Sequence, residues 1–212
     1  MKILDIVKKA NLYSVIFDNN NLYNLHLEII IKNNLKIDDN IDDKLLKIIL
    51  EDNDFINTKN SALIFLARRQ HSRNELFLKL MKKKYNKAII EKVLNNLEHS
   101  GFINDKEFTQ NYIQELLNKK HEGINKIRNR LYTKGIKKEI IDEELKNIIQ
   151  PDNILDNALV LSKKKIKILS KNNLSKDKIR QRIFSYLVSK GYNYETISEV
   201  IRISKLEENR DD

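Results

Sequence analysis

Residues 127–145, IRNRLYTKGIKKEIIDEEL, carry a pattern that returns at residues 76–94 (LFLKLMKKKYNKAIIEKVL) and at residues 183–201 (IFSYLVSKGYNYETISEVI). In each copy, apolar side chains recur every three or four positions on both sides of a short polar turn, which is the spacing of amphipathic helices. A period of about fifty residues is typical of chains built from stacked supersecondary units. The sequence therefore predicts a mainly α fold, in which three tandem three-helix repeats form an elongated curved array.

The turn in the middle of each copy has a lysine followed by the residue at which a helix ends. In the second and third copies this residue is Gly135 and Gly191. A helix commonly ends with one residue in the left-handed conformation, where glycine avoids the cost of a β-carbon. The first copy has Lys84 at this position. We therefore expect its turn to be strained or differently shaped.

Polar residues and the single proline mark where helices begin. Ser72, with Glu75 three residues later, has the spacing of a capping box. Asn104 or Asp105 is expected to cap the first helix of the second repeat. Pro151 fits a boundary between repeats, because proline lacks an amide hydrogen and would break a helix interior.

The first part of the chain has a different period. Residues 13–17 and 23–27 alternate apolar and polar side chains, and the Asn and Asp residues between them tolerate the left-handed positions of a turn. This pattern predicts a small N-terminal β-hairpin, to which residues 3–7 could add a third strand. Short helices are expected over residues 28–33 and 41–50.

These signals divide the chain into four segments. We expect the β-hairpin and short helices to occupy residues 1–57, the first helical repeat residues 58–104, the second residues 105–152 and the third residues 153–212. The third repeat has a lengthened opening, residues 154–173, which contains a run of three lysines.

The composition points to a soluble cytoplasmic protein, which we expect to be a monomer. The chain has 212 residues and no cysteine, so it can form neither a disulfide nor a thiolate metal site. No apolar run approaches the length of a membrane span, and the first residues lack the apolar core of a signal peptide. The chain is rich in Asn and Ile as well as Lys, which is the bias expected of a coding sequence poor in G and C. Part of its lysine content is explained by this bias.

The net charge of +10 is unevenly distributed. Residues 1–57 have seven Lys and Arg against ten Asp and Glu, whereas residues 58–104 have ten against three. Residues 105–152 have ten against nine, and residues 153–212 thirteen against eight. The positive charge lies in the repeats, which indicates attraction to phosphate groups or to an acidic protein surface.

The basic residues of the repeats are the candidate binding residues. They could form a surface that follows a phosphate backbone, although an ordinary solvated helix face has the same composition. Pairs of short helices joined by a turn are also typical of helix-turn-helix DNA-binding domains, so a stand-alone DNA-binding helical-repeat protein is the alternative function. The candidates are Arg68, Arg69, Arg73, Lys82, Lys83, Lys84, Lys119, Lys120, Arg128, Arg130, Lys134, Arg180, Arg182 and Lys190.

Most aromatic residues of the repeats have the spacing of packing residues, which argues against a row of base-stacking rings. This expectation applies to Phe77, Tyr85, Phe102, Phe108, Tyr112, Tyr132 and Tyr192.

No motif in the sequence indicates catalysis. The four histidines are isolated, and the acidic run over residues 38–43 lacks the glycine and the final Glu of a calcium loop, so we expect it to cap a helix. Phosphate-binding loops, nucleophile elbows and paired catalytic carboxylates are also missing. We therefore expect no enzymatic activity, no cofactor and no metal.

Residues 62–145 closely resemble the RecX family of recombinase regulators. The third repeat resembles it more loosely, through Leu187 and Lys190-Gly191-Tyr192, and the β-hairpin is similar to that of the longer members of the family. The first turn, with Lys84 in place of glycine, departs from the family pattern. The residues that carry the resemblance are Ala62-Leu63, Leu66-Ala67-Arg68-Arg69, His71-Ser72-Arg73, Glu75-Leu76, Leu80, Val93, Leu97, Gly101-Phe102-Ile103-Asn104-Asp105, Phe108, Tyr112, Gly123, Ile127, Leu131 and Lys134-Gly135-Ile136.

The resemblance implies a non-enzymatic protein that binds RecA, in the groove of the filament that RecA forms on single-stranded DNA. Such a protein limits filament extension and restrains strand exchange, ATP hydrolysis and co-protease activity, and so regulates DNA repair, recombination and the SOS response. Contact with single-stranded DNA is expected through the filament, and the resemblance leaves open whether the protein also binds DNA directly.

Overall fold

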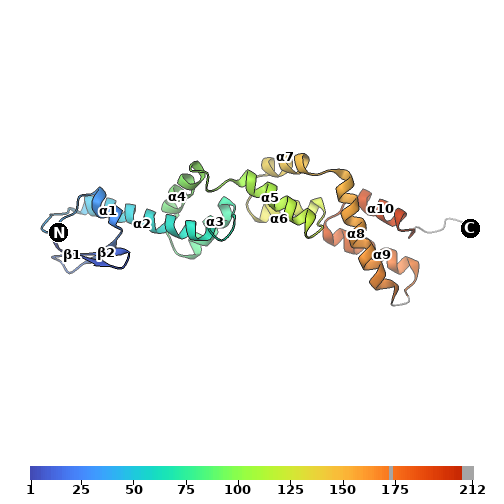
Figure 1. Ribbon diagram of the computed structural model, residues 1–212, viewed down its shortest axis with the longest axis horizontal. Helices are drawn as coiled ribbons and strands as arrows, with labels where there is room; N and C mark the ends of the chain where they lie inside the picture. Colours follow the sequence, from blue (N-terminus) through green and yellow to red (C-terminus); the bar gives the residue numbers. More distant parts are fainter. Residues whose placement is uncertain (172–173, 207–212) are drawn as a thin grey trace, which may run out of the picture. The chain divides into compact units, whose positions relative to one another are not determined.

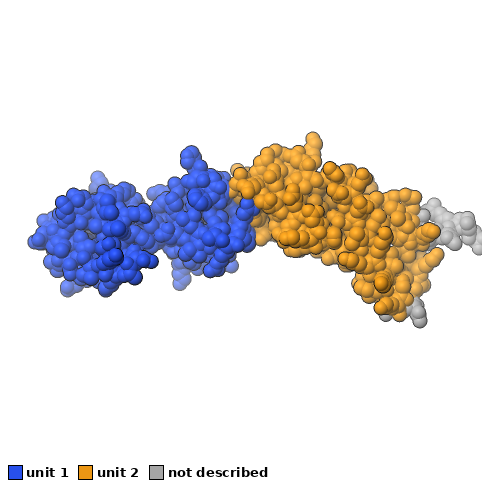
Figure 2. Space-filling model, in the orientation of Figure 1, with its two compact units in different colours: residues 1–103 blue, residues 104–212 orange. Residues whose placement is uncertain are grey.

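The computed structural model describes residues 1–171 and 174–206, in which it has ten helices and one three-stranded sheet (Figure 1). The chain divides into two compact units, residues 1–103 and residues 104–212 (Figure 2). The first unit contains the β element and the first repeat, and the second contains the other two repeats. A mainly α fold with three helical repeats and a small N-terminal β element is therefore confirmed. Within the described ranges, no helix is both long and apolar enough to cross a membrane.

The sheet at the N-terminus is an antiparallel meander in which Val15 pairs with Tyr23. The expected hairpin and third strand are both present. The second expected strand ends two residues early, because His26 is the N-cap residue of the helix that follows. The elements are β1 (Ile3–Lys9), β2 (Leu12–Phe17), β3 (Leu22–Leu25) and helix α1 (Leu27–Lys32).

Helix α2 (Asp43–Leu66) is longer than expected. The sequence predicts one helix ending at residue 50 and another beginning near residue 62, whereas the structure has a single helix. The carboxylate of Asp42 caps it, accepting a hydrogen bond from the Leu45 amide at 2.6 Å, so the acidic run caps a helix as expected. The polar middle of α2 stays helical because its side chains find partners. Asn53, for example, accepts a hydrogen bond from the backbone N–H of His26 at 2.9 Å.

Two separate cores share this helix. Ile49 is buried with residues of the sheet and α1, whereas Ala62 is buried with the helices of the first repeat. The boundary expected between residues 57 and 58 therefore falls inside a continuous helix that serves both cores.

The first repeat is completed by α3 (Arg73–Lys82) and α4 (Lys87–His99). The capping box is confirmed: Ser72 Oγ accepts from the Glu75 amide at 3.1 Å, and the Ser72 amide donates to the Glu75 carboxylate at 3.4 Å. Leu80 is among the fully buried side chains of the core formed by the three helices.

The turn after α3 has the same shape as its counterparts in the other repeats. Lys84 has φ of 65°, compared with 75° at Gly135 and 90° at Gly191. In each case the next residue donates its amide to a carbonyl of the last helical turn, as Tyr85 does to Leu80 at 3.4 Å. Of the two expected alternatives, strain is the one that the structure has: the turn keeps its shape, and a lysine is held in the left-handed region.

Replacing Lys84 with glycine should therefore stabilise the first unit. Relief of the left-handed conformation is worth about 1 kcal/mol in the free energy of unfolding, after the greater freedom of glycine in the unfolded chain is subtracted. Urea unfolding would measure the change, with Gly135→Ala as the matched control that should destabilise the chain by a similar amount. A Lys84→Gly variant less stable than the parent protein would contradict this account.

The second unit contains the second and third repeats around one shared core. Ile127 and Leu131 of the second repeat lie in the same cluster of buried side chains as Ile183 and Leu187 of the third. Asn104, rather than Asp105, caps the first helix. The elements are α5 (Asp105–Asn118), α6 (Ile124–Thr133), α7 (Lys138–Ile148), α8 (Pro151–Ser170), α9 (Lys176–Lys190) and α10 (Tyr194–Ile203).

Pro151 is the first residue of α8, where its fixed φ suits a helix and its missing amide hydrogen costs nothing. Most of the lengthened opening expected over residues 154–173 is this helix, and residues 172–173 lie outside the described ranges.

The two repeats of this unit are joined end to end through backbone hydrogen bonds. The amide of Gly123, at the start of α6, donates to the carbonyl of Lys190 at 2.8 Å, and the Asn125 amide donates to the carbonyl of Gly191 at 3.1 Å. The free N–H groups of one helix thus satisfy the free carbonyls at the end of another. The Tyr192 hydroxyl adds a bond to the carbonyl of His121 at 2.8 Å. We call this contact the glycine junction.

Candidate basic interaction surfaces

The expected binding residues of the first repeat lie at the two ends of α3. Arg68 and Arg69 follow α2, Arg73 is the first residue of α3, and Lys82, Lys83 and Lys84 are at its end. All except Arg73 are exposed. The structure therefore places these cations around one short helix, but it gives them different surroundings.

Arg69 and Arg73 bind carboxylates of their own repeat. Arg69 bridges to both oxygens of Glu75 at 3.1 and 3.2 Å, and so ties the loop before α3 to its capping box. Arg73 donates to Glu91 at 2.8 Å and to Asn95 at 2.6 Å, which links the start of α3 to α4. Both guanidinium groups have a structural role, and a substitution at either would disturb packing as well as charge.

The turn lysine of every repeat lies over an aromatic ring. Lys83 is 5.2 Å from the ring centre of Phe65, while Lys134 and Lys190 are each 5.6 Å from a tyrosine, Tyr112 and Tyr186 respectively. Such contacts contribute about 0.5–1 kcal/mol at exposed sites. The lysine that recurs in all three copies is therefore explained by packing within each repeat.

Two arginines of the second repeat are also engaged. Arg128 forms an ion pair with Asp142 of α7, and Arg130 pairs with the buried Glu122 at 2.6 Å. The hydrogen bonds to these carboxylates raise the pKa of each guanidinium above its usual value. Both arginines hold α6 in place.

The remaining candidates separate into paired and unpaired cations. Lys120 lies 3.8 Å from Glu115, and Arg180 lies 3.9 Å from Asp177. Five exposed candidates form neither an ion pair nor a contact with an aromatic ring among the described residues, and their charge is available to a partner: Arg68, Lys82, Lys84, Lys119 and Arg182.

Sequence reasoning missed two groups of cations. Lys79 lies 4.8 Å from the Phe65 ring, beside Lys83, and its position four residues before Lys83 was the available signal. The lysines of α8 form the second group, and the run of three lysines in the sequence pointed to them.

The aromatic residues behave largely as expected, with two exceptions. Phe108 and Tyr192 are buried, whereas Phe102 and Tyr132 are exposed, at 58% and 42%. Tyr194, which the sequence reading did not single out, is 72% exposed.

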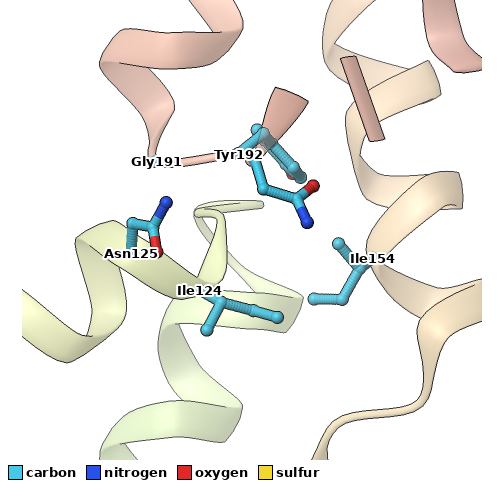
Figure 3. Close-up of a pocket in the computed structure, with 6 residues that line it drawn as sticks. Ile124, Asn125, Ile154, Gly191 and Tyr192 are labelled. Carbon is cyan, nitrogen blue, oxygen red and sulfur yellow. The ribbon is translucent and has the colours of Figure 1, made fainter. Parts of the chain in front are cut away.

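A small pocket lies beside the glycine junction in the second unit (Figure 3). Its volume is about 130 Å³ and no charged side chain lines it. Pockets for drug-sized ligands measure roughly 300–1,000 Å³, so this one is a packing gap. Within the described residues, no group of three His, Asp or Glu side chains is placed to hold a metal ion.

The stability of the first repeat should depend on pH through His71. Its Nδ1 lies 2.9 Å from the Arg69 carbonyl, so the neutral ring donates a proton there, and burial lowers its pKa below the usual 6.5. Below pH 6.5 the unfolded chain binds more protons at this site than the folded one, so the stabilisation is present above pH 6.5 and is lost as the pH falls.

We expect the free energy of unfolding to fall between pH 7.5 and pH 5.5 by more in the parent protein than in a His71→Gln variant. Urea unfolding at the two pH values would measure this difference, and equal falls in the two proteins would exclude His71 as the cause.

The comparisons with known proteins agree with the repeat architecture. Residues 59–97 match the family model described as "RecX, first three-helix domain", residues 104–145 match the second such domain, and residues 152–201 match the third.

Curated relatives match most of the chain. "Regulatory protein RecX" of Clostridium tetani (strain Massachusetts / E88) is 38% identical over 174 residues, which cover 82% of this chain and 79% of the relative. The protein of the same name from Clostridium botulinum (strain Alaska E43 / Type E3) is 31% identical over 189 residues, covering 89% and 88%.

Two solved structures have a similar fold. A crystal structure of a regulatory protein RecX covers 97% of this chain and 99% of its own with a TM-score of 0.75, at 22% identity. A crystal structure of RecX from Lactobacillus salivarius covers 73% of this chain and 98% of its own with a TM-score of 0.65, at 25% identity.

Proposed function

Since this chain belongs to the RecX family, we propose that it regulates the RecA recombinase by binding the filament that RecA forms on single-stranded DNA. The observation that carries the proposal is the presence of all three helical domains of the family, in order along the chain. The protein acts by binding and carries out no catalysis of its own.

The finer proposal is that binding in the filament groove limits filament extension, strand exchange, ATP hydrolysis and co-protease activity. DNA repair and the SOS response would be regulated as a result. Two properties of the repeats support it. Successive helical units offer many separate contacts to a partner that is itself a repeating polymer. Unpaired cations such as Arg68 and Lys84 in the first repeat and Lys119 and Arg182 in the others are available to phosphate or carboxylate groups.

The direct test adds the purified protein to RecA on single-stranded DNA in the presence of ATP. We expect slower ATP hydrolysis, less strand exchange and shorter filaments as the ratio of protein to RecA rises. If hydrolysis, exchange and filament length stay unchanged over a wide range of ratios, the proposal is wrong.

A further inference from the structure

The hairpin of α8 and α9 carries the densest positive charge in the chain. Residues 163–171 and 174–182 together contain nine Lys and Arg and a single Asp. Helices α8 and α9 pack against each other (Figure 1). These cations therefore lie on one helical hairpin. We call the cationic ends of these two helices the basic hairpin.

Most of these cations are exposed and have no carboxylate partner. Arg180 is near Asp177, and Lys165 lies 5.5 Å from the ring centre of Tyr186. The other seven are exposed and form no ion pair in the part of the chain that the structure describes: Lys163, Lys164, Lys167, Lys171, Lys176, Lys178 and Arg182.

The stability of the fold does not account for this charge. Lys163 and Lys167 of α8 and Lys171 at its C-cap follow one another at intervals of four residues, and like charges at that spacing destabilise a helix by a few tenths of a kcal/mol per pair. Cations are favourable at the C-terminal end of a helix, but the effect falls off within the last turn. It can therefore account for Lys167 and Lys171, and leaves Lys163 and Lys164 unexplained.

Helix α8 is longer than the corresponding helix of the second repeat. Helix α8 has 20 residues, whereas α5, the first helix of the second repeat, has 14. The additional length carries lysines rather than core residues: in the last eight residues of α8, Leu169 alone is fully buried. The extension projects charge and adds little to the shared core.

The kind of charge indicates the kind of partner. Lysine is depleted from protein–protein interfaces, where arginine and aromatic residues are enriched. An ammonium group is a mobile point charge that suits contact with phosphate groups regardless of sequence. Six of the seven exposed unpaired cations are lysines, so the basic hairpin fits a phosphate backbone better than an acidic protein surface.

Two exposed rings in the same repeat favour a single strand over a duplex. Tyr194, at the start of α10, is 72% exposed, and its ring is 6.3 Å from that of Phe184 on α9, which is 36% exposed. Proteins that bind single strands combine backbone cations with rings on which unpaired bases stack.

We propose that the basic hairpin, with Tyr194 as a stacking ring, is a direct binding site for single-stranded nucleic acid. The site binds without RecA, so the inference does not rest on the proposed RecA function. It also assigns a role to the lysine run that the sequence reading left without one.

The test measures fluorescence anisotropy of a labelled oligothymidylate with the full chain, without recombinase, at several NaCl concentrations. Changing Lys163, Lys164, Lys167 and Lys171 to Gln should weaken binding more than tenfold at low salt. It should also reduce the slope of log affinity against log salt by about 3, since each phosphate contact on a single strand contributes about 0.7.

The matched control changes four exposed lysines of other helices and their caps, Lys87, Lys92, Lys137 and Lys138, to Gln and so removes the same charge. It should keep most of the affinity and the slope. A Tyr194→Ala variant should weaken binding about fivefold or more with an unchanged slope, because stacking does not release counterions.

Three outcomes would overturn the inference. One is an equal loss of affinity in the hairpin and control variants, which would mean that net charge alone attracts DNA. Another is binding of labelled polyglutamate as tight as that of the oligonucleotide, which would indicate an acidic protein partner. The third is tighter binding of duplex DNA with no effect of Tyr194→Ala, which would exclude the single-stranded site.

Discussion

Replacing Gly123 with alanine should destabilise the second unit by about 3–5 kcal/mol, because a β-carbon at this position has no room. It would lie 2.5 Å from the amide nitrogen of Tyr192 and closer still to the carbonyl group of Gly191, all of which are backbone atoms that cannot rotate away. Opening this contact also weakens the two hydrogen bonds that join α6 to the end of α9. Each such bond contributes about 0.5–1.5 kcal/mol.

The other glycines distinguish two reasons for which the chain needs glycine, namely a left-handed backbone and a lack of space for a β-carbon. Gly101 has φ of 74° and open space around its missing β-carbon, so Gly101→Ala should cost only the left-handed conformation, about 1 kcal/mol. Gly123 has φ of −76°, which any residue can adopt, so an alanine there would be disfavoured only by the clash of its β-carbon. Gly191 has φ of 90° and would also collide with Lys126, so its substitution should be the most damaging of the three.

Hydrogen exchange followed by mass spectrometry would locate the effect. We expect Gly123→Ala to increase exchange in both α6 and α9, because the two repeats share one core, and to leave α3 and α4 unchanged. Urea unfolding would give the free energy. If Gly123→Ala costs no more than Gly101→Ala, the glycine junction does not stabilise the unit.

Reversing the charge of Arg68, Lys82 and Lys84 together should reduce inhibition of RecA at least about tenfold, as judged by the protein concentration that halves ATP hydrolysis. These three cations are exposed and form no ion pair among the described residues, so their loss leaves no buried carboxylate without a partner. Changing them to Glu replaces attraction with repulsion, and like charges facing each other across an interface cost several kcal/mol.

The choice of these residues follows from the contacts of their neighbours. Arg69 and Arg73 are expected binding residues as well, but each holds a carboxylate of its own repeat. A substitution at either would confuse a loss of binding with a loss of stability, whereas circular dichroism of the Arg68, Lys82 and Lys84 variant should match that of the parent.

Two controls make the result decisive. Changing Lys8, Lys9 and Lys44 to Glu alters net charge equally on exposed positions of the β element and the start of α2, and should leave inhibition nearly intact. The second control changes stability without changing charge: Leu80→Ala truncates a fully buried side chain and should lower the free energy of unfolding by about 2–5 kcal/mol. Undiminished inhibition by the charge-reversal variant would show that another face binds the filament.

Sequence reasoning identified those features of the candidate surfaces that depend on charge alone. It found the strong positive balance of the first repeat and a set of cations around α3, and both are present. It did not separate Arg68, whose charge is free, from Arg73, whose guanidinium contacts Glu91 and Asn95. In the sequence, every arginine carries the same formal charge, whether or not a neighbouring helix supplies a carboxylate that pairs with it in the folded protein.

The sequence by itself determined the local elements of this protein. The capping box at Ser72, the left-handed turns and the antiparallel hairpin each arise from residues a few positions apart, and short-range hydrogen bonds and sterics decide them. The recurrence of one such pattern was enough to predict three helical repeats.

Only the tertiary structure decided how these elements are joined. It showed that α2 runs uninterrupted through two cores, and that Gly123 meets Gly191 across the second unit. It also showed which cations are held by carboxylates and which remain free. The physical reason is that each of these outcomes depends on residues brought together from distant parts of the chain. Close packing and the need to satisfy buried backbone groups select among arrangements that local patterns leave equally open.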